Sequence, residues 1–306
     1  MRRNSSSHKL EKSTISTQWI RSAKLSTSRK PIRPKKPVIV FSHGNSFPAS
    51  TYGGLTSLLE ARGYPVRAIE KIGHDPAYPV TSNWPHLVQQ LADFSTLQAK
   101  KAGTPIVLVG HSLGGFLSLM CAAKHPELAG GALRGVVLLD SPIISGWRAK
   151  MVGIAKLTGL AGPLGPGAIS KNRRHTWASR EEVFLHFRAK KGFAAWDDEA
   201  IHRYVDGGTF VDGNARRLAF DRDIETAIYN ALPDNLGLLM ASHPPKCPVA
   251  FIGGRQSVEI KRVGLAMTQR ITEGRVRMVD GSHLFPIENP LVTAAAIDAE
   301  VTSMLI

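Results

Sequence analysis

Ser112 lies in a pattern of residue types that can make a serine hydroxyl a nucleophile. The run Gly110-His111-Ser112-Leu113-Gly114 fits G-x-S-x-G between a strongly apolar stretch and an amphipathic one, the context of a sharp turn from a strand into a helix. Glycines two residues before and after the serine remove side chains that would collide there. We expect the hydroxyl to project above a sheet and the Leu113 amide to face a substrate carbonyl. The alternative is a glycine-rich helix start with an incidental serine.

A histidine is required beside this serine, because a hydroxyl is a poor nucleophile until a base removes its proton. Among the eleven histidines, His283 is the best candidate, since it follows the last expected strand in the run Asp280-Gly281-Ser282-His283. Its loop would leave the same edge of the sheet as Ser112. His43 and His111 are expected to be loop residues near the reacting atoms.

The run Phe41-Ser42-His43-Gly44-Asn45 predicts a tight turn at the end of the first strand. A second amide that stabilises a developing oxyanion should come from such a turn, and we assign it to the Asn45 backbone N–H. The alternative is a plain turn at a strand end.

The elements that must position these loops alternate along the chain. Short apolar runs rich in β-branched residues predict strands buried on both faces, and stretches with apolar residues at helical spacing separate them. The expected strands are Val38–Phe41, Pro65–Ile69, Pro105–Val109, Gly135–Leu139, Pro248–Ile252 and Val276–Val279, with helices over 51–62, 84–100, the stretch after Ser112, and the stretch that opens at Asn289-Pro290. This order predicts an α/β fold with a doubly wound, mostly parallel sheet.

Residues 141–246 interrupt that alternation. The segment is rich in Gly, Arg, Trp and His and contains helical stretches without a convincing strand, and Ser179-Arg180-Glu181-Glu182 predicts a capped helix start. An insertion at this point would lie over the carboxyl ends of the strands, where parallel sheets bind ligands. We therefore expect a core formed by 37–140 and 247–306, with 141–246 as a helical cap.

The basic charge is concentrated in an N-terminal tail. The chain has a net charge of +15, and residues 1–36 hold eleven Lys or Arg against one acid, Glu11. With few large apolar residues, this tail is expected to be disordered. It could be a transit peptide, a polyanion-binding arm or a solvated extension; because no aromatic residue interleaves its basic run, no nucleic-acid partner is expected.

No stretch is apolar enough to span a membrane. Two cysteines, Cys121 and Cys247, offer neither a disulfide framework nor zinc-ligand spacing. These features favour a cytoplasmic protein, with mitochondrial import through the tail as the alternative.

His43-Gly44, Gly110-His111-Ser112-Leu113-Gly114-Gly115 and Gly281-Ser282-His283, in this order and each at a strand end, resemble the α/β-hydrolase superfamily over residues 38–306. The resemblance implies the α/β-hydrolase fold, with the cap inserted after the sixth strand of that fold. It also implies a Ser-acid-His triad, a mobile cap, and no metal or organic cofactor. It does not fix a substrate, because the superfamily includes esterases, lipases, thioesterases, amidases, C–C hydrolases and cofactor-free haloperoxidases.

The sequence departs from the superfamily at the acid of the triad. Most members have Gly-x-x-Asp after the strand that corresponds to 248–252, and Ser257 stands here where that Asp is usual. One branch carries the acid at the end of the preceding strand, where this chain has Asp140. We favour Asp140 as the residue that orients His283; Glu259 is the alternative.

Together these patterns predict a hydrolase that cleaves a small or medium carboxylic ester, or thioester, through an acyl-enzyme on Ser112. The expected partner is a small-molecule ester, and the oligomeric state stays open. Two alternatives remain: other chemistry of the superfamily, such as C–C hydrolysis or haloperoxidation, and a binding protein without catalysis.

Overall fold

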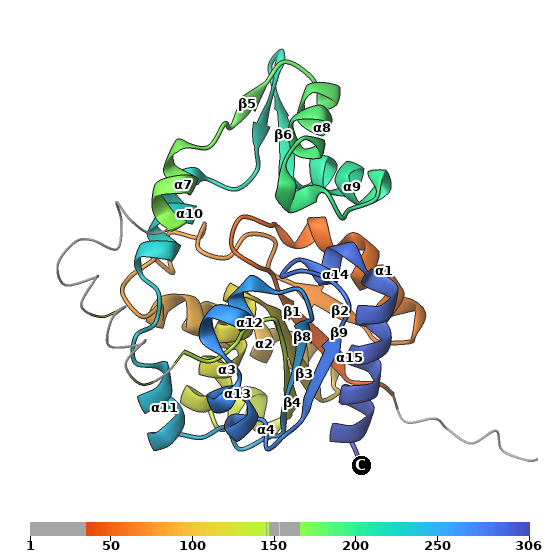
Figure 1. Ribbon diagram of the computed structural model, residues 1–306. Coiled ribbons are helices and arrows are strands. Elements are labelled where there is room, and N and C mark those ends of the chain that lie inside the picture. Colours follow the sequence, from red (N-terminus) through yellow and green to blue (C-terminus); the bar gives the residue numbers. More distant parts are fainter. Residues whose placement is uncertain (1–34, 145, 147–152, 154–165) are drawn as a thin grey trace, which may run out of the picture. The chain divides into compact units, whose positions relative to one another are not determined.

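A computed structural model of the chain describes residues 35–144, 146, 153 and 166–306 (Figure 1). The expected disordered tail therefore lies outside the described residues, apart from Lys35 and Lys36. The Lys36 ammonium lies 2.9 Å from the Asp298 carboxylate and 4.0 Å from the centroid of the Tyr64 ring. Lys36 thus packs against the fold and does not belong to a solvated tail.

Six parallel strands form the central sheet. They are β1 (Val38–Ser42), β2 (Val66–Ala68), β3 (Ile106–His111), β4 (Leu133–Leu139), β8 (Val249–Gly254) and β9 (Val276–Val279). Their order across the sheet is β2-β1-β3-β4-β8-β9, and all neighbours pair in parallel. The expected doubly wound parallel sheet is confirmed, with each expected strand found within two residues of its expected start.

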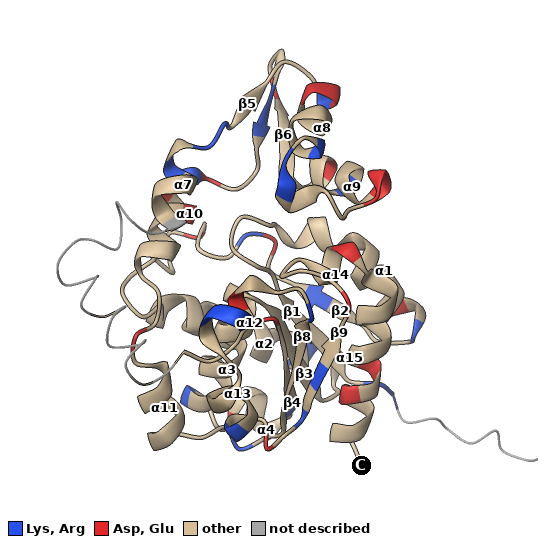
Figure 2. Cartoon of the chain, in the orientation of Figure 1, with Lys and Arg blue, Asp and Glu red and all other residues tan. Residues whose placement is uncertain are grey.

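Alternate residues of each strand point to opposite faces of the sheet. Val38 and Val40 of β1 pack in the cluster that contains α2 (Pro85–Ala102) and α3 (Leu113–Lys124). Ile39 and Phe41 pack in the other cluster, with α1 (Gly53–Ala61) and α15 (Pro290–Met304). Figure 1 shows these two helix pairs on the two sides of the sheet. Strands β1, β3 and β8 contain no Lys, Arg, Asp or Glu (Figure 2), which explains why the sequence shows them as unbroken apolar runs.

Short helices complete the core. They are the 3-10 helix η1 (Ala49–Tyr52) and the α-helices α4 (Leu128–Gly131), α12 (Val258–Val263), α13 (Ala266–Ile271) and α14 (Phe285–Glu288). The expected start of the last helix is confirmed, with Pro290 as its first residue and Asn289 at the N-cap position. The Asn289 side chain makes no capping hydrogen bond, because its amide donates to the Asp280 carbonyl at 2.9 Å.

The segment between β4 and β8 is not purely helical, contrary to the sequence expectation. Its described elements are α7 (Pro166–Asn172), β5 (Thr176–Trp177), α8 (Arg180–Arg188), η2 (Lys191–Phe193), α9 (Asp198–Gly208), β6 (Thr209–Asp212), β7 (Ala215–Leu218), α10 (Arg222–Asn230) and α11 (Leu236–Ser242). The three strands form an antiparallel sheet in the order β5-β7-β6. They are two to four residues long, and β7 contains two arginines, so they lack the apolar pattern that predicts a strand. The capped start of α8 is confirmed: Ser179 Oγ accepts from the Glu182 N–H at 3.1 Å.

An aromatic cluster fills this inserted segment and joins it to the loop after β1. Phe187, Phe193, Trp196 and Tyr204 pack against one another, and the Phe47 ring centroid lies 5.5 Å from that of Tyr204. The insertion is therefore packed, through Phe47, against the part of the core that follows β1. None of the helices that the structure describes has the length and hydropathy of a membrane span.

Candidate active site

Ser112 is the single residue between β3 and α3, and its backbone is strained. It has φ 52° and ψ −116°, a combination rare for a residue with a side chain. Such strain persists only where the surroundings hold it, and it recurs at functional sites. The Ser112 N–H donates to the Leu139 carbonyl at 3.0 Å, and its own carbonyl accepts from the Ser141 hydroxyl at 2.9 Å.

The glycines of the motif are required by close backbone approach. A Cβ on Gly110 would lie 2.1 Å from the Gly114 carbonyl oxygen, and one on Gly114 would lie 2.0 Å from the Ser42 carbonyl oxygen. Because both obstacles are backbone atoms, they cannot move aside as a flexible side chain could. The pattern G-x-S-x-G therefore lets α3 pack tightly against β1 and β3 and leaves Ser112 in the bend between them.

The structure brings three of the expected site residues together. Ser112 Oγ lies 3.0 Å from His283 Nε2, and His283 Nδ1 lies 2.7 Å from Asp140 Oδ2. Ser112 follows β3, Asp140 follows β4 and His283 follows β9, so all three lie at the carboxyl edge of the sheet. A hydroxyl and a carboxylate are thus each in hydrogen-bonding reach of one imidazole, on its two ring nitrogens, an arrangement that could activate the hydroxyl.

Asp140 is fully buried and accepts several hydrogen bonds. Its Oδ1 accepts from the Gly254 N–H at 2.8 Å and its Oδ2 accepts from the Ser257 hydroxyl at 2.5 Å. Ser257 is the residue that stands where the superfamily usually has its acid. Here it donates a hydrogen bond to the carboxylate that comes from the neighbouring strand. Nothing in the residues around Ser257 predicts this role.

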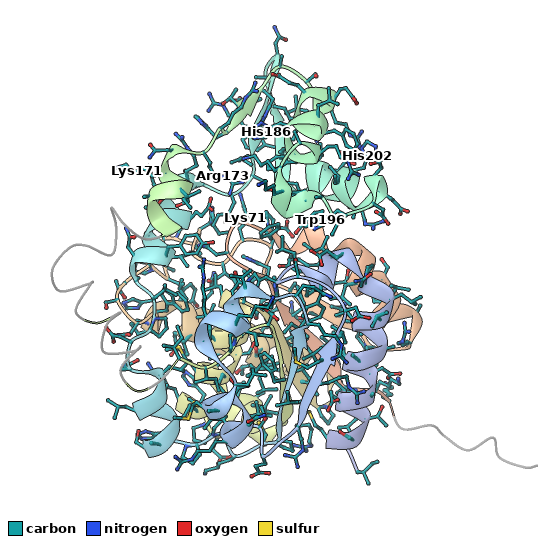
Figure 3. The ribbon with its side chains drawn as sticks, viewed as in Figure 1. Lys71, Lys171, Arg173, His186, Trp196 and His202 are labelled. Atoms are coloured by element: carbon teal, nitrogen blue, oxygen red, sulfur yellow. The ribbon has the colours of Figure 1, made fainter. Side chains whose placement is uncertain are left out.

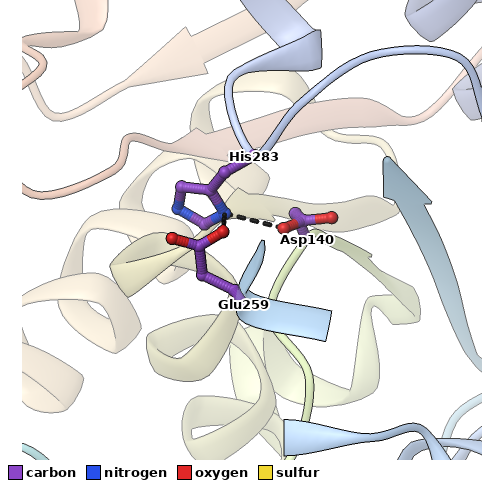
Figure 4. A group of neighbouring side chains, drawn as sticks. All are labelled: Asp140, Glu259 and His283. Carbon is purple, nitrogen blue, oxygen red and sulfur yellow. Dashed lines mark hydrogen bonds and ion pairs between the residues drawn. The ribbon is translucent and has the colours of Figure 1, made fainter. Parts of the chain in front are cut away.

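Glu259, the alternative acid, lies farther from the imidazole. Its Oε2 is 3.6 Å from His283 Nδ1, and its side chain is 43% exposed, against 0% for Asp140 (Figure 4). The geometry favours Asp140 as the partner of Nδ1. The ligand atoms of Asp140, Glu259 and His283 lie within 4.8 Å of one another, so within the described residues this group could hold a metal ion. Asp140 and Nδ1 are, however, already engaged with each other.

The surroundings of His283 favour its protonated form. Burial alone lowers the pKa of the imidazole, but the hydrogen bond and negative charge of Asp140, with the charges of Glu259 and Glu288, outweigh it. The pKa of His283 is therefore raised above its ordinary value. An imidazole in this setting binds a proton more readily, which suits a general base.

A buried hydrogen-bond chain connects the turn after β1 to the backbone of His283. The Gly44 N–H donates to the Tyr52 hydroxyl at 3.1 Å, and that hydroxyl donates to His111 Nδ1 at 2.6 Å. His111 Nε2–H donates to the His283 carbonyl at 2.8 Å. Burial, followed by the nearby charge of His283, holds the pKa of His111 well below its ordinary value, so this imidazole stays neutral. These hydrogen bonds hold the backbone of His283 in place. They were not predicted from the sequence, because nothing near Tyr52 indicates that His111 is its partner.

The two backbone amides expected to bind an oxyanion follow neighbouring strands. Leu113 is the first residue of α3, and Asn45 lies in the turn after β1. Ser42 at the end of β1 pairs with Gly110 of β3, so the two turns leave the sheet side by side. The structure therefore places Asn45 and Leu113 at the same edge of the sheet as Ser112. His43, as expected, is a loop residue; it is buried, and burial lowers its pKa to about 4. His111, also expected in a loop, is instead the last residue of β3.

Comparison with known proteins gives the same kind of fold. Residues 39–296 match the profile of the Alpha/beta hydrolase family. Among solved structures, E-2-(acetamidomethylene)succinate hydrolase superposes with a TM-score of 0.65 at 21% identity, covering 87% of this chain and 92% of that one. The thioesterase domain from the curacin biosynthetic pathway superposes with a TM-score of 0.62 at 17% identity, covering 87% and 92%.

Curated relatives match parts of the chain. A monoglyceride lipase homolog from monkeypox virus is 23% identical over 54% of this chain and 63% of its own length. The pyrethroid hydrolase of Sphingobium wenxiniae is 33% identical over 35% of this chain and 38% of its own. Mouse monoglyceride lipase is 30% identical over 38% of each. The matched regions thus span between 38% and 63% of the length of these relatives.

We predict that Gly114→Ala destabilises the fold by about 3 kcal/mol or more, because the added methyl group would clash with a backbone carbonyl that cannot move aside. Gly53→Ala at the start of α1 is the matched control, since its Cβ would meet no atom within 4 Å. That change should alter stability by less than about 1 kcal/mol. Urea unfolding followed by circular dichroism measures both. Equal stability of the two variants would show that the close contact at Gly114 is not what the motif requires.

Proposed function

Because the chain belongs to the alpha/beta hydrolase family, we propose that it is a serine hydrolase of small or medium carboxylic esters or thioesters. The observation that carries the proposal is the line of hydrogen bonds from Ser112 Oγ to His283 Nε2 and from His283 Nδ1 to Asp140, at 3.0 and 2.7 Å. Ser112 is the proposed nucleophile, His283 the base and Asp140 the residue that orients the base.

In the proposed mechanism, Ser112 Oγ attacks the carbonyl carbon while His283 Nε2 takes its proton. Asp140 holds the proton on Nδ1, so that Nε2 is free to accept one, and stabilises the imidazolium that forms. The amides of Leu113 and Asn45 would stabilise the oxyanion. His283 then gives the proton to the departing alcohol or thiol, and a water molecule, activated by the same imidazole, hydrolyses the acyl-enzyme.

An acyl substrate is supported by what the relatives are called. Two relatives are named as a pyrethroid hydrolase and a monoglyceride lipase, and one structural neighbour is named as a thioesterase domain. We further propose that residues 141–246 act as the cap that selects the substrate, since Phe47 beside the Asn45 turn packs against Tyr204 of this segment.

Ser112→Ala should reduce ester turnover by at least about 10⁴-fold while the protein stays folded, because the nucleophile is lost but a small residue still fits the bend. Hydrolysis of p-nitrophenyl esters of graded chain length measures the loss, with thioester and amide counterparts in the same panel. Labelling by a fluorophosphonate provides a second readout, because it requires an activated hydroxyl. A parent protein that is neither labelled nor active on any ester would favour a binding role, and equal hydrolysis by parent and mutant would reject Ser112 as nucleophile.

Asp140→Asn should reduce kcat about 10³- to 10⁴-fold, because an amide at this place no longer stabilises the imidazolium or fixes its tautomer. Glu259→Gln is the matched control, since this side chain is partly exposed and its oxygen lies 3.6 Å from Nδ1. It should keep kcat within about threefold, because a screened charge contributes little. If only Glu259→Gln is crippled, the assignment of the acid is reversed.

The pH dependence of kcat/KM should carry the signature of His283. The base must be unprotonated, and Asp140, Glu259 and Glu288 raise its pKa against the effect of burial. Activity should therefore rise with pH through a midpoint above the ordinary imidazole value of about 6.5. Removing one negative charge in Glu259→Gln disfavours the imidazolium and should move this midpoint to lower pH.

Glu273→Gln is the control for this shift, because Glu273 precedes β9 and so lies at the opposite edge of the sheet from His283. Its profile should coincide with that of the parent. An unmoved midpoint in Glu259→Gln would mean that the carboxylate does not act on the imidazole.

A further inference from the structure

The turn that contains the backbone N–H of Asn45 is itself strained. The Phe47 N–H donates to the Gly44 carbonyl at 3.2 Å, which closes a four-residue turn with Ser46 at its third position. Ser46 has φ 77°, the left-handed value that a type II turn requires there and that glycine normally supplies. A serine at this position needs outside contacts to hold it.

Those contacts come from Glu225 of α10, which lies in the inserted segment. The Ser46 hydroxyl donates to Glu225 Oε1, and the Asn45 side-chain amide donates to the Glu225 backbone carbonyl at 3.1 Å. The Glu225 side chain is 4% exposed. The Tyr229 hydroxyl is a further partner of Ser46. Glu225, about 180 residues away in sequence, thus binds both central residues of the turn: its buried carboxylate holds Ser46 and its backbone carbonyl holds Asn45.

Arg173 holds Glu225 in turn. Its Nη1 lies 3.0 and 2.9 Å from the two carboxylate oxygens, and its Nη2 donates to the Tyr204 hydroxyl at 3.2 Å. Arg173 follows α7 and is labelled in Figure 3. Its side chain is 16% exposed, so the pair is largely desolvated. Removing one partner of such a pair would leave a buried charge without compensation.

We propose that Glu225, fixed by Arg173, is a positioning residue that keeps the Asn45–Ser46 turn in its strained conformation. In this conformation the backbone N–H of Asn45 is directed at the oxyanion. This inference rests on the proposed function, because it needs an acyl transfer in which an oxyanion forms. The inserted segment then does more than shape a pocket: it completes the catalytic geometry of the core through a carboxylate that never touches the substrate.

The place where Glu225 contacts the turn favours this role over a purely structural one. The first residue of the turn, Gly44, is already fixed by the Tyr52 hydroxyl at 3.1 Å. The strained residue is Ser46, and it is the one whose side chain reaches Glu225. Without that contact, Ser46 would relax toward negative φ, and the peptide groups on either side of Asn45 would rotate.

The first test compares Ser46→Ala with Ser46→Gly. Both variants lose the hydroxyl, but glycine adopts positive φ without strain and alanine does not. We expect Ser46→Ala to lower kcat about 10- to 100-fold, part of the effect of removing a whole oxyanion donor, with KM for a p-nitrophenyl ester unchanged. Ser46→Gly should stay within about threefold of the parent, since the turn conformation needs no support.

The second test is rescue. Glu225→Gln should lower kcat by a similar factor, and adding Ser46→Gly to it should restore most of the loss. Thermal melts by circular dichroism identify any variant that is unfolded, and the Ser46 pair tests the proposal independently should Glu225→Gln not fold. Asp206→Asn is the matched control: it breaks the exposed Arg180–Asp206 pair of the same segment and should leave kcat unchanged.

Equal kcat losses in Ser46→Ala and Ser46→Gly, or a Glu225→Gln enzyme as fast as the parent, would overturn this inference. A double variant as slow as Glu225→Gln alone would do the same. These outcomes leave the proposed function intact as long as the parent hydrolyses esters and Ser112→Ala does not. A parent without Ser112-dependent hydrolysis would instead remove the proposed function, and this inference with it.

Discussion

The carboxylate of Asp140 lies where water does not reach, and a charge in such a place must be compensated. Its compensation comes from three donors: the Gly254 amide, the Ser257 hydroxyl and the imidazole of His283. The loops after β4, β8 and β9 are therefore tied to one buried charge. This constraint fixes which way the imidazole faces, and with it the distance to Ser112. The rest of the site is arranged around that connection.

The sequence predicted the sheet well because three of its strands, β1, β3 and β8, are buried along their whole length. Such strands are unbroken apolar runs, and the helices between them show their own period, so elements and order follow from local pattern. Ser112 and His283 could be proposed from the sequence because each lies in a loop that follows an expected strand. The choice between Asp140 and Glu259 could not be made this way. It depends on Gly254 and Ser257, which donate to Asp140 across 114 and 117 residues, and no local pattern encodes such a contact.

The inserted segment was predicted poorly for the opposite physical reason. Its three strands are short and lie in a small antiparallel sheet, so neither length nor alternation distinguishes them from loops. Its stability comes from an aromatic cluster and from Arg173 with Glu225, whose partners are set by tertiary packing. The same holds for Tyr52, which meets His111 across 59 residues. Residues of this kind support a site from a distance, and their types alone give no indication of it.

Strain connects these observations. Seven described residues other than glycine have positive φ, and three of them, Ser46, Ser112 and Asp140, follow the adjacent strands β1, β3 and β4. Each is held by hydrogen bonds that a relaxed backbone would lose. A strained loop is tolerated only on a rigid support, which the central sheet provides with its apolar core on both faces. Because the support for Ser46 comes from the insertion and not from the sheet, a change in the insertion can alter the Asn45–Ser46 turn while Ser112, His283 and Asp140 keep their places. The core therefore determines the line of hydrogen bonds through His283, and the insertion determines whether the turn opposite it is held in its strained form.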